Sequence, residues 1–101
     1  MEHHFHVKIE FDPAKSSRNA TERGLPFDRV GDFDWDTALV AADNRFPYTE
    51  PRFVAVGLIG ERLHVVCFTP ITGGIRVISF RKANAREAKY HEQKTIDRQE
   101  W

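Results

Sequence analysis

The fold is decided by residues 52–82, which read RFVAVGLIGERLHVVCFTPITGGIRVISFRK. Three runs rich in β-branched and aromatic residues follow one another here, a pattern typical of consecutive strands. They cover residues 52–59, 62–69 and 75–82. Gly60-Glu61 fits a tight hairpin connection, and the segment 70–74 fits the next turn. The stretch therefore predicts an antiparallel meander.

The residues before this stretch predict a strand and a well-delimited helix. Residues 5–11 alternate apolar and polar side chains, which is the period of a half-buried strand. Asp12 and Pro13 then open a helix, because Asp accepts hydrogen bonds from free amides and Pro fits the first helical position. Gly24 closes it in a left-handed conformation. Shorter elements follow, a second helix at about 27–34 and a strand at 39–42.

The last element predicted is a helix from Asn84 to about Asp97. Asn84 can cap its first turn, and Glu87 three residues later completes a capping box. The predicted order is therefore β-α-α-β-β-β-β-α, an α+β class with an antiparallel meander packed by helices. A length of 101 residues suits a single domain, 1–101.

The composition argues against several classes of protein. No apolar run is long enough to cross a bilayer, and the N-terminal residues lack the apolar core of a secretory signal. The lone Cys67 lies in an apolar run, which predicts a buried thiol in a reducing cytoplasm. His3, His4 and His6 lack carboxylate or cysteine partners, so we expect neither a metal nor another cofactor.

Charge is balanced overall but unevenly distributed along the chain. The first fifty residues hold six Lys and Arg against ten Asp and Glu, and the remainder holds nine against five. This asymmetry favours a basic working surface on the C-terminal half, although ordinary charge scatter explains it equally well.

The strand at 75–82 carries the most informative cations. Strict alternation places Ile75, Val77, Ser79 and Arg81 on one face, and it places Arg76, Ile78, Phe80 and Lys82 on the other. Arg81 ends the strand, where its guanidinium can hold a phosphate through two parallel hydrogen bonds. The alternative is an arginine that simply faces solvent.

Other side chains could assist Arg81. Arg52 opens an earlier strand with Glu50 two residues before it, so the carboxylate either orients the arginine, acts as a base or forms a surface ion pair. We expect Arg52 and Arg81 to converge on one exposed pocket. His64 either transfers protons or packs against the sheet. The final helix carries a stripe that either grips RNA or is an ordinary exposed face; it comprises Arg86, Lys89, Tyr90 and Gln93.

Four segments, taken in order, resemble the BrnT toxins of bacterial type II toxin–antitoxin systems. They span residues 11 to 90, and the last is the most specific. The segments are Phe11-Asp12-Pro13-Ala14-Lys15 with Asn19; Arg23-Gly24-Leu25-Pro26-Phe27; Glu50-Pro51-Arg52-Phe53 with Gly57; and residues 75–84 with Arg86-Glu87 and Tyr90.

The resemblance implies a RelE-like ribonuclease that inhibits translation. It also implies a BrnA-type ribbon-helix-helix antitoxin, which neutralises the toxin and alone contacts operator DNA. By position, the resemblance makes Glu50, Arg52, Arg81 and Tyr90 catalytic candidates, with His64 a weaker one from its chemistry. The expected RNA contacts are Lys15, Arg76, Lys82, Arg86 and Lys89.

The chain departs from the family pattern at two places. Glu22-Arg23 stands where the family usually has Lys-His, and Phe80 replaces a small alanine. If the family histidine transfers protons, this chain lacks it. The alternative function is therefore a catalytically weakened toxin fold that serves as a corepressor with a DNA-binding antitoxin.

Overall fold

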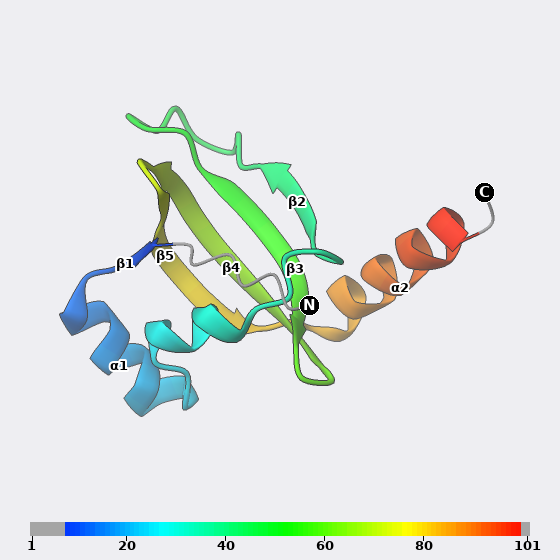
Figure 1. Ribbon diagram of the computed structural model, residues 1–101, viewed down its shortest axis with the longest axis horizontal. Coiled ribbons are helices and arrows are strands. Elements are labelled where there is room, and N and C mark those ends of the chain that lie inside the picture. The colour runs from blue at the N-terminus through cyan, green and yellow to red at the C-terminus, as the bar shows by residue number, and fades with distance from the viewer. Residues whose placement is uncertain (1–7, 100–101) are drawn as a thin grey trace.

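The computed structural model of the protein describes residues 8–99 (Figure 1). Its strands are β1 (Lys8–Glu10), β2 (Leu39–Ala42), β3 (Phe53–Ile59), β4 (Arg62–Ile71) and β5 (Gly74–Lys82). Its helices are α1 (Pro13–Arg23), the 3₁₀ helix η1 (Phe27–Asp32) and α2 (Ala85–Gln99). The α+β class is confirmed. The predicted strand residues 5–7, together with His3, His4 and His6, lie outside the described residues.

One five-stranded sheet forms the body of the protein, in the order β1-β5-β4-β3-β2. The meander of β2 to β5 is antiparallel as expected, whereas β1 adds to β5 in parallel and makes the sheet mixed. Gly74 permits this addition, because a Cβ there would overlap the Lys8 carbonyl group. The edge of β5 is therefore paired with β1, the short strand that leads into α1.

The predicted turn at 70–74 is wrong by two residues. Strand β4 continues through Pro70 to Ile71, and the chain turns at Thr72-Gly73, where Gly73 has a φ of 77°. Pro70 is tolerated because β3 begins only at Phe53, opposite Phe68. No β3 residue therefore needs the N–H group that proline lacks.

Local capping explains where the helices begin and end. Asp12 accepts a hydrogen bond of 2.9 Å from the Ala14 amide, and Gly24 ends α1 with a φ of 69°. Asn84 and Glu87 form the predicted capping box of α2, with reciprocal bonds of 2.9 and 2.8 Å. The second helix is 3₁₀ rather than α and ends at Asp32, as suits a short segment behind a proline.

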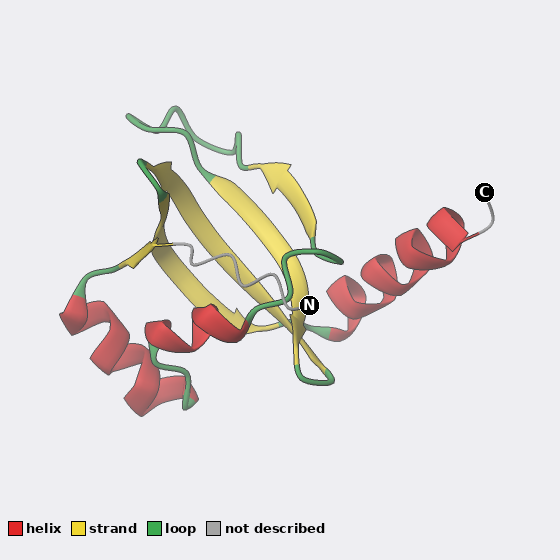
Figure 2. Ribbon diagram, in the orientation of Figure 1, coloured by secondary structure: helices red, strands yellow, loops and turns green. Residues whose placement is uncertain are grey.

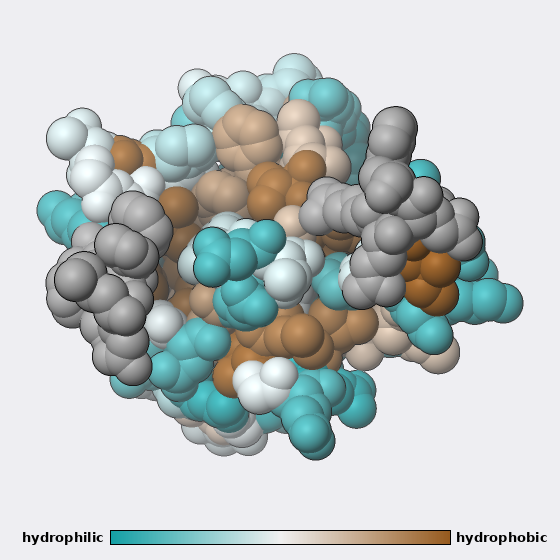
Figure 3. Space-filling view, turned by 45° about the vertical axis from the view of Figure 1, so that its right-hand side comes forward, coloured by the Kyte–Doolittle hydropathy of each residue, from teal (hydrophilic) through white to brown (hydrophobic). Residues whose placement is uncertain are grey.

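The core lies between η1 and one face of the sheet (Figure 2). Phe80, Val66, Leu25 and Val30 are almost fully buried there. Gly57 is required beneath them, because a Cβ would lie 2.6 Å from the Phe33 ring. On one face of the molecule, apolar side chains lie above and below a hydrophilic cluster at its centre (Figure 3).

Helix α2 projects away from the sheet (Figure 1). Near its middle it is tied to the segment before β2 by His91, which is buried and whose Nε2 donates to the Thr37 carbonyl oxygen at 3.1 Å. Within the described part of the chain, no helix is long and apolar enough to span a membrane.

A β-bulge in β5 changes which of its side chains share a face. Cys67 pairs with Ser79, but the next residue, Phe68, pairs with Val77, so Ile78 has no partner in β4. The strict alternation predicted for 75–82 is therefore wrong. The residues on the covered face are Ile75, Val77, Phe80 and Lys82, and those on the opposite face are Arg76, Ser79 and Arg81.

Candidate functional site

The face of the sheet opposite η1 carries three arginines. Arg81 pairs with Val65 at one end of this face, and Arg76 pairs with Thr69 towards the other end. Continuing the register between β3 and β4 places Arg52 beside Thr69. The separation between Arg76 and Arg81 is about 15 Å along the strand, from the usual rise per residue. Arg52 and Arg81 thus share a face, as the nuclease hypothesis requires, but they border different hollows rather than converging on one.

The first hollow, here called the arginine hollow, has a volume of about 420 Å³. Its floor is formed by side chains of the three central strands, Val54, Val65, Cys67 and Ser79. Its walls are two arginine–carboxylate pairs, Arg81 with Glu87 and Arg45 with Asp43. Two guanidinium groups therefore border one concave surface whose volume is within the usual range for small-ligand sites.

Arg81 is held by Glu87 from the start of α2. Its Nη1 and Nη2 atoms donate to the two carboxylate oxygens at 2.8 Å each. This bidentate pair raises the pKa of Arg81 and lowers the pKa of Glu87. Glu87 also accepts from the Asn84 amide, so the helix cap and the arginine share one carboxylate. The sequence indicated only the capping role.

Arg45 is held in the same way by Asp43, which follows β2. Its Nε and Nη2 atoms donate to the carboxylate at 2.8 and 2.9 Å. The Tyr48 hydroxyl donates to the same buried carboxylate at 3.1 Å. The hydrogen bond from Arg45 holds the pKa of Asp43 well below its usual range. Sequence reasoning missed Arg45, because nothing in the polar loop distinguishes it before the loop is folded.

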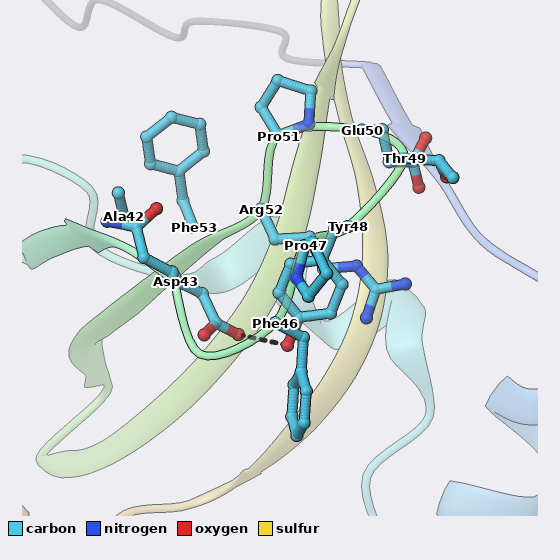
Figure 4. Close-up of a pocket in the computed structure, with 11 residues that line it drawn as sticks. Ala42, Asp43, Phe46, Pro47, Tyr48, Thr49, Glu50, Pro51, Arg52 and Phe53 are labelled. Atoms are coloured by element: carbon cyan, nitrogen blue, oxygen red, sulfur yellow. Dashed lines mark hydrogen bonds between the residues drawn. The ribbon is translucent and has the colours of Figure 1, made fainter.

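The second hollow, here called the loop hollow, lies within residues 42–53 and has a volume of about 370 Å³ (Figure 4). Arg52 lies in it with its guanidinium carbon 4.2 Å from the centre of the Tyr48 ring. Glu50 does not pair with Arg52; it accepts from Arg76 at 3.4 Å. Arg76 also lies 3.8 Å from Glu10, so Arg76 and not Arg52 is the arginine that Glu50 orients.

A third hollow of about 200 Å³ lies between α1 and β5. It is bordered by Lys15, Arg18 and Arg23 from α1 and by Ser79 from β5. Glu22 borders the same hollow, and Ser79 also borders the arginine hollow, so the cations of α1 lie on the other side of Ser79 from Arg81. The C-terminal half therefore does not carry the basic surface alone.

The remaining candidates lie elsewhere. Lys82 is exposed at the end of β5, and Arg86, Lys89 and Tyr90 are exposed on α2, where Lys94 Nζ lies 5.5 Å from the Tyr90 ring centre. His64 is 3% exposed on the covered face, with Nδ1 donating to the Arg62 carbonyl oxygen at 2.9 Å. Burial lowers the pKa of His64. His64 therefore packs against the sheet, which was one of the two interpretations that its sequence position left open.

The cysteine prediction is confirmed in its structural part. Cys67 is free and buried in the floor of the arginine hollow, and burial raises the pKa of its thiol. A raised pKa keeps the thiol protonated and poorly nucleophilic at neutral pH.

The fold and the site define a small α+β protein whose sheet face opposite η1 carries oriented arginines, an arrangement suited to binding an anionic polymer. A family model for BrnT, the ribonuclease toxin of a type II toxin–antitoxin system, matches residues 11–87. The chain belongs to this family, whose members are ribonuclease toxins paired with an antitoxin. Comparisons with curated proteins and with solved structures gave no match.

Proposed function

We propose that this protein is a metal-independent endoribonuclease that cleaves RNA in the arginine hollow and so inhibits translation in the cytoplasm. A BrnA-like ribbon-helix-helix antitoxin neutralises it and carries the complex to operator DNA. One observation carries the proposal: Arg45 and Arg81 border the same hollow, and each is oriented by two hydrogen bonds to a carboxylate.

The two guanidinium groups supply the main requirement of RNA cleavage. The ribose 2′-oxygen attacks phosphorus, the bond to the 5′-oxygen breaks, and negative charge builds up on the phosphoryl oxygens between these events. Positioned cations at those oxygens are usually the largest contribution to such a reaction. Arg81 and Arg45 take this role, and Arg52 binds the chain in the adjoining loop hollow.

Few groups at the edges of the hollows suit proton transfer. Glu87 is a poor proton acceptor, because Arg81 lowers its pKa, so its role is to position Arg81. Glu50 borders the loop hollow and accepts from Arg76, so its role is to orient Arg76 rather than to take the proton of a 2′-hydroxyl in the arginine hollow. Tyr90 lies one helical turn beyond Glu87, and it is the candidate that protonates the leaving oxygen. His64 lies on the opposite face of the sheet and takes no part.

The basic residues around these hollows bind the rest of the RNA. Lys15 contacts it from the hollow between α1 and β5, which Ser79 also borders. Arg76 contacts the RNA backbone beyond Arg52. On the Arg81 side of the site, the RNA backbone is contacted by the cations at the end of β5 and on α2, which are Lys82, Arg86 and Lys89. Contacts of this kind weaken steeply as the salt concentration rises.

The test compares Arg81→Ala with Arg29→Ala, a matched loss of one exposed arginine on η1, by expression in bacteria without an antitoxin. We expect Arg81→Ala to abolish growth arrest and to reduce cleavage by purified protein about 10²- to 10³-fold, as for loss of an oriented charge donor. Wild-type cleavage should persist with EDTA present.

Two controls make the result decisive. Arg81→Ala combined with Glu87→Gln removes the unpaired carboxylate while keeping the helix cap, and circular dichroism reports whether each variant is folded. Full activity of a folded Arg81→Ala variant would reject the assignment. Intact RNA after expression of the wild-type chain would reject cleavage altogether and favour the corepressor function.

A further inference from the structure

We infer that the loop hollow is a nucleobase subsite, in which one base of single-stranded RNA stacks on Phe46 while the guanidinium of Arg52 binds the anionic backbone beside it. The inference rests on the proposed ribonuclease function: it adds Phe46, to which no role has been given above, and states what Arg52 binds beside it.

Phe46 is the first reason. Its side chain is 64% exposed at the rim of the hollow, and its ring projects from the loop beside Tyr48 (Figure 4). The two ring centres lie 5.9 Å apart with the planes at 74°. This edge-to-face contact orients the Phe46 ring, and the exposed part of the ring offers a surface on which a flat partner can stack.

The loop that carries Phe46 is built to hold its shape. The Tyr48 amide donates to the Phe46 carbonyl oxygen at 2.9 Å, and the Tyr48 hydroxyl donates to the buried carboxylate of Asp43. Asp43 is in turn joined to Arg45 and, through its amide, to the Arg52 carbonyl oxygen at 2.8 Å. An aromatic ring on a preorganised loop loses little conformational freedom when a ligand binds.

Arg52 is the second, independent reason. Within residues 8–99, the guanidinium of Arg52 has no carboxylate partner, unlike those of Arg45, Arg76 and Arg81. Its Nε atom is buried without a hydrogen-bond partner, and its guanidinium makes a cation–π contact with the face of the Tyr48 ring. An unpaired cation next to an exposed aromatic ring matches a nucleotide, which joins a flat base to an anion.

The position of the loop hollow supports the same occupant. Its volume of about 370 Å³ falls within the usual range for small-ligand sites, roughly 300–1,000 Å³. It shares Ala42, Asp43 and Asn44 as a common wall with the arginine hollow. A nucleotide whose phosphate lies between Arg45 and Arg81 therefore has a neighbouring nucleotide at Phe46.

The experiment uses the full chain and two labelled oligonucleotides of equal phosphate number. One is a 2′-O-methyl RNA, in which the blocked 2′-oxygen cannot attack phosphorus, and the other is its abasic counterpart. Fluorescence anisotropy gives the Kd of each. We expect Phe46→Ala to weaken binding of the RNA about 5- to 150-fold, as for loss of one base stack, and to leave binding of the abasic strand unchanged.

Three further variants make the result specific. Phe46→Trp should retain the affinity for RNA, because indole also stacks on bases. Ile96→Ala removes an apolar side chain that is exposed on α2 and should change neither Kd. Arg52→Ala should weaken binding of both strands, because it removes a charge and not a ring.

Equal wild-type affinity for the two strands, or an unchanged Kd in Phe46→Ala, overturns the subsite. The subsite is also overturned if Phe46→Ala keeps its affinity for RNA but no longer binds the ribbon-helix-helix protein of the adjacent gene. That result would show that the loop makes a protein contact. These failures leave cleavage by the wild type intact. A wild type that neither binds nor cleaves RNA instead refutes the proposed function itself.

Discussion

Asn19 on α1 joins two parts of the fold next to Arg81. Its Nδ2 atom donates to the Leu25 carbonyl oxygen at 2.7 Å and to the Phe80 carbonyl oxygen at 2.8 Å. Leu25 is 2% exposed and Phe80 is fully buried. Strand β1 pairs with β5 only at residues 74–76, so it does not reach Phe80. The Asn19 side chain therefore donates the hydrogen bond that a neighbouring strand would otherwise give to the Phe80 carbonyl oxygen.

The Asn19→Ala variant removes both hydrogen bonds at once. Each buried carbonyl left unpaired costs about 1–3 kcal/mol, and alanine offsets about 0.5 kcal/mol through its better helix propensity. The free energy of unfolding should therefore fall by about 1.5–5.5 kcal/mol. For a domain of this size, at about 6 °C per kcal/mol, that change lowers the Tm by roughly 10–35 °C. Asn19→Asp should be worse, because a carboxylate would face two carbonyl oxygens.

Thermal unfolding followed by circular dichroism measures the change, with Ser17→Ala as the control because Ser17 is exposed on the same helix. Urea unfolding gives the same free energy independently. An Asn19→Ala variant within 0.5 kcal/mol of the wild type, on the scale of ordinary surface substitutions, would refute the claim that this side chain closes the edge of β5.

Three further perturbations test the packing and the charges. Gly57→Ala should lower the free energy of unfolding by about 1–3 kcal/mol, because its Cβ meets the Phe33 ring; a neutral result in urea would show that the ring moves freely. Burial holds the pKa of His64 below its usual 6.5, so the unfolded chain takes up the proton first and stability falls as the pH drops below about 6.5. In His64→Asn, urea unfolding at pH 7.5 and 5.5 should show a smaller loss, and an identical loss contradicts the assignment. Arg81 lowers the pKa of Glu87 from its usual 4.5, so that carboxylate stabilises the fold above this pH and the stabilisation is lost as the pH falls through its lower folded value. Glu87→Gln keeps the helix cap and should flatten the acid limb of the stability profile, whereas an unchanged limb would assign it to other carboxylates.

Much of the fold could be predicted because its signals are local. Asp12, Gly24 and Asn84 mark helix ends through bonds to backbone groups a few residues away. Runs rich in β-branched and aromatic residues marked β3 and β4, and Gly60-Glu61 marked the hairpin between them. Errors appeared where a distant strand changed the outcome, as at Pro70, whose tolerance depends on where β3 begins.

The site was predictable in its residue types but not in its geometry. The sequence singled out Arg52 and Arg81, and the structure places both on the face opposite η1. It did not indicate that Arg45 faces Arg81, because that approach depends on how the loop after β2 folds back over the sheet. It also assigned Glu50 to Arg52, whereas the folded chain brings Glu50 to Arg76.

By itself, then, the sequence determined the α+β class, the capped helices, the meander and the family, since each depends on short-range spacing or on motifs in order. Only the tertiary structure decided which arginines share a surface. The bulge at Ile78 moves Arg76 to the face that holds Arg81, and the sheet order places β4 between Arg52 and Arg81. Both depend on how consecutive strands pair with one another, and the extra residue of the bulge is not recorded in the periodicity of either strand.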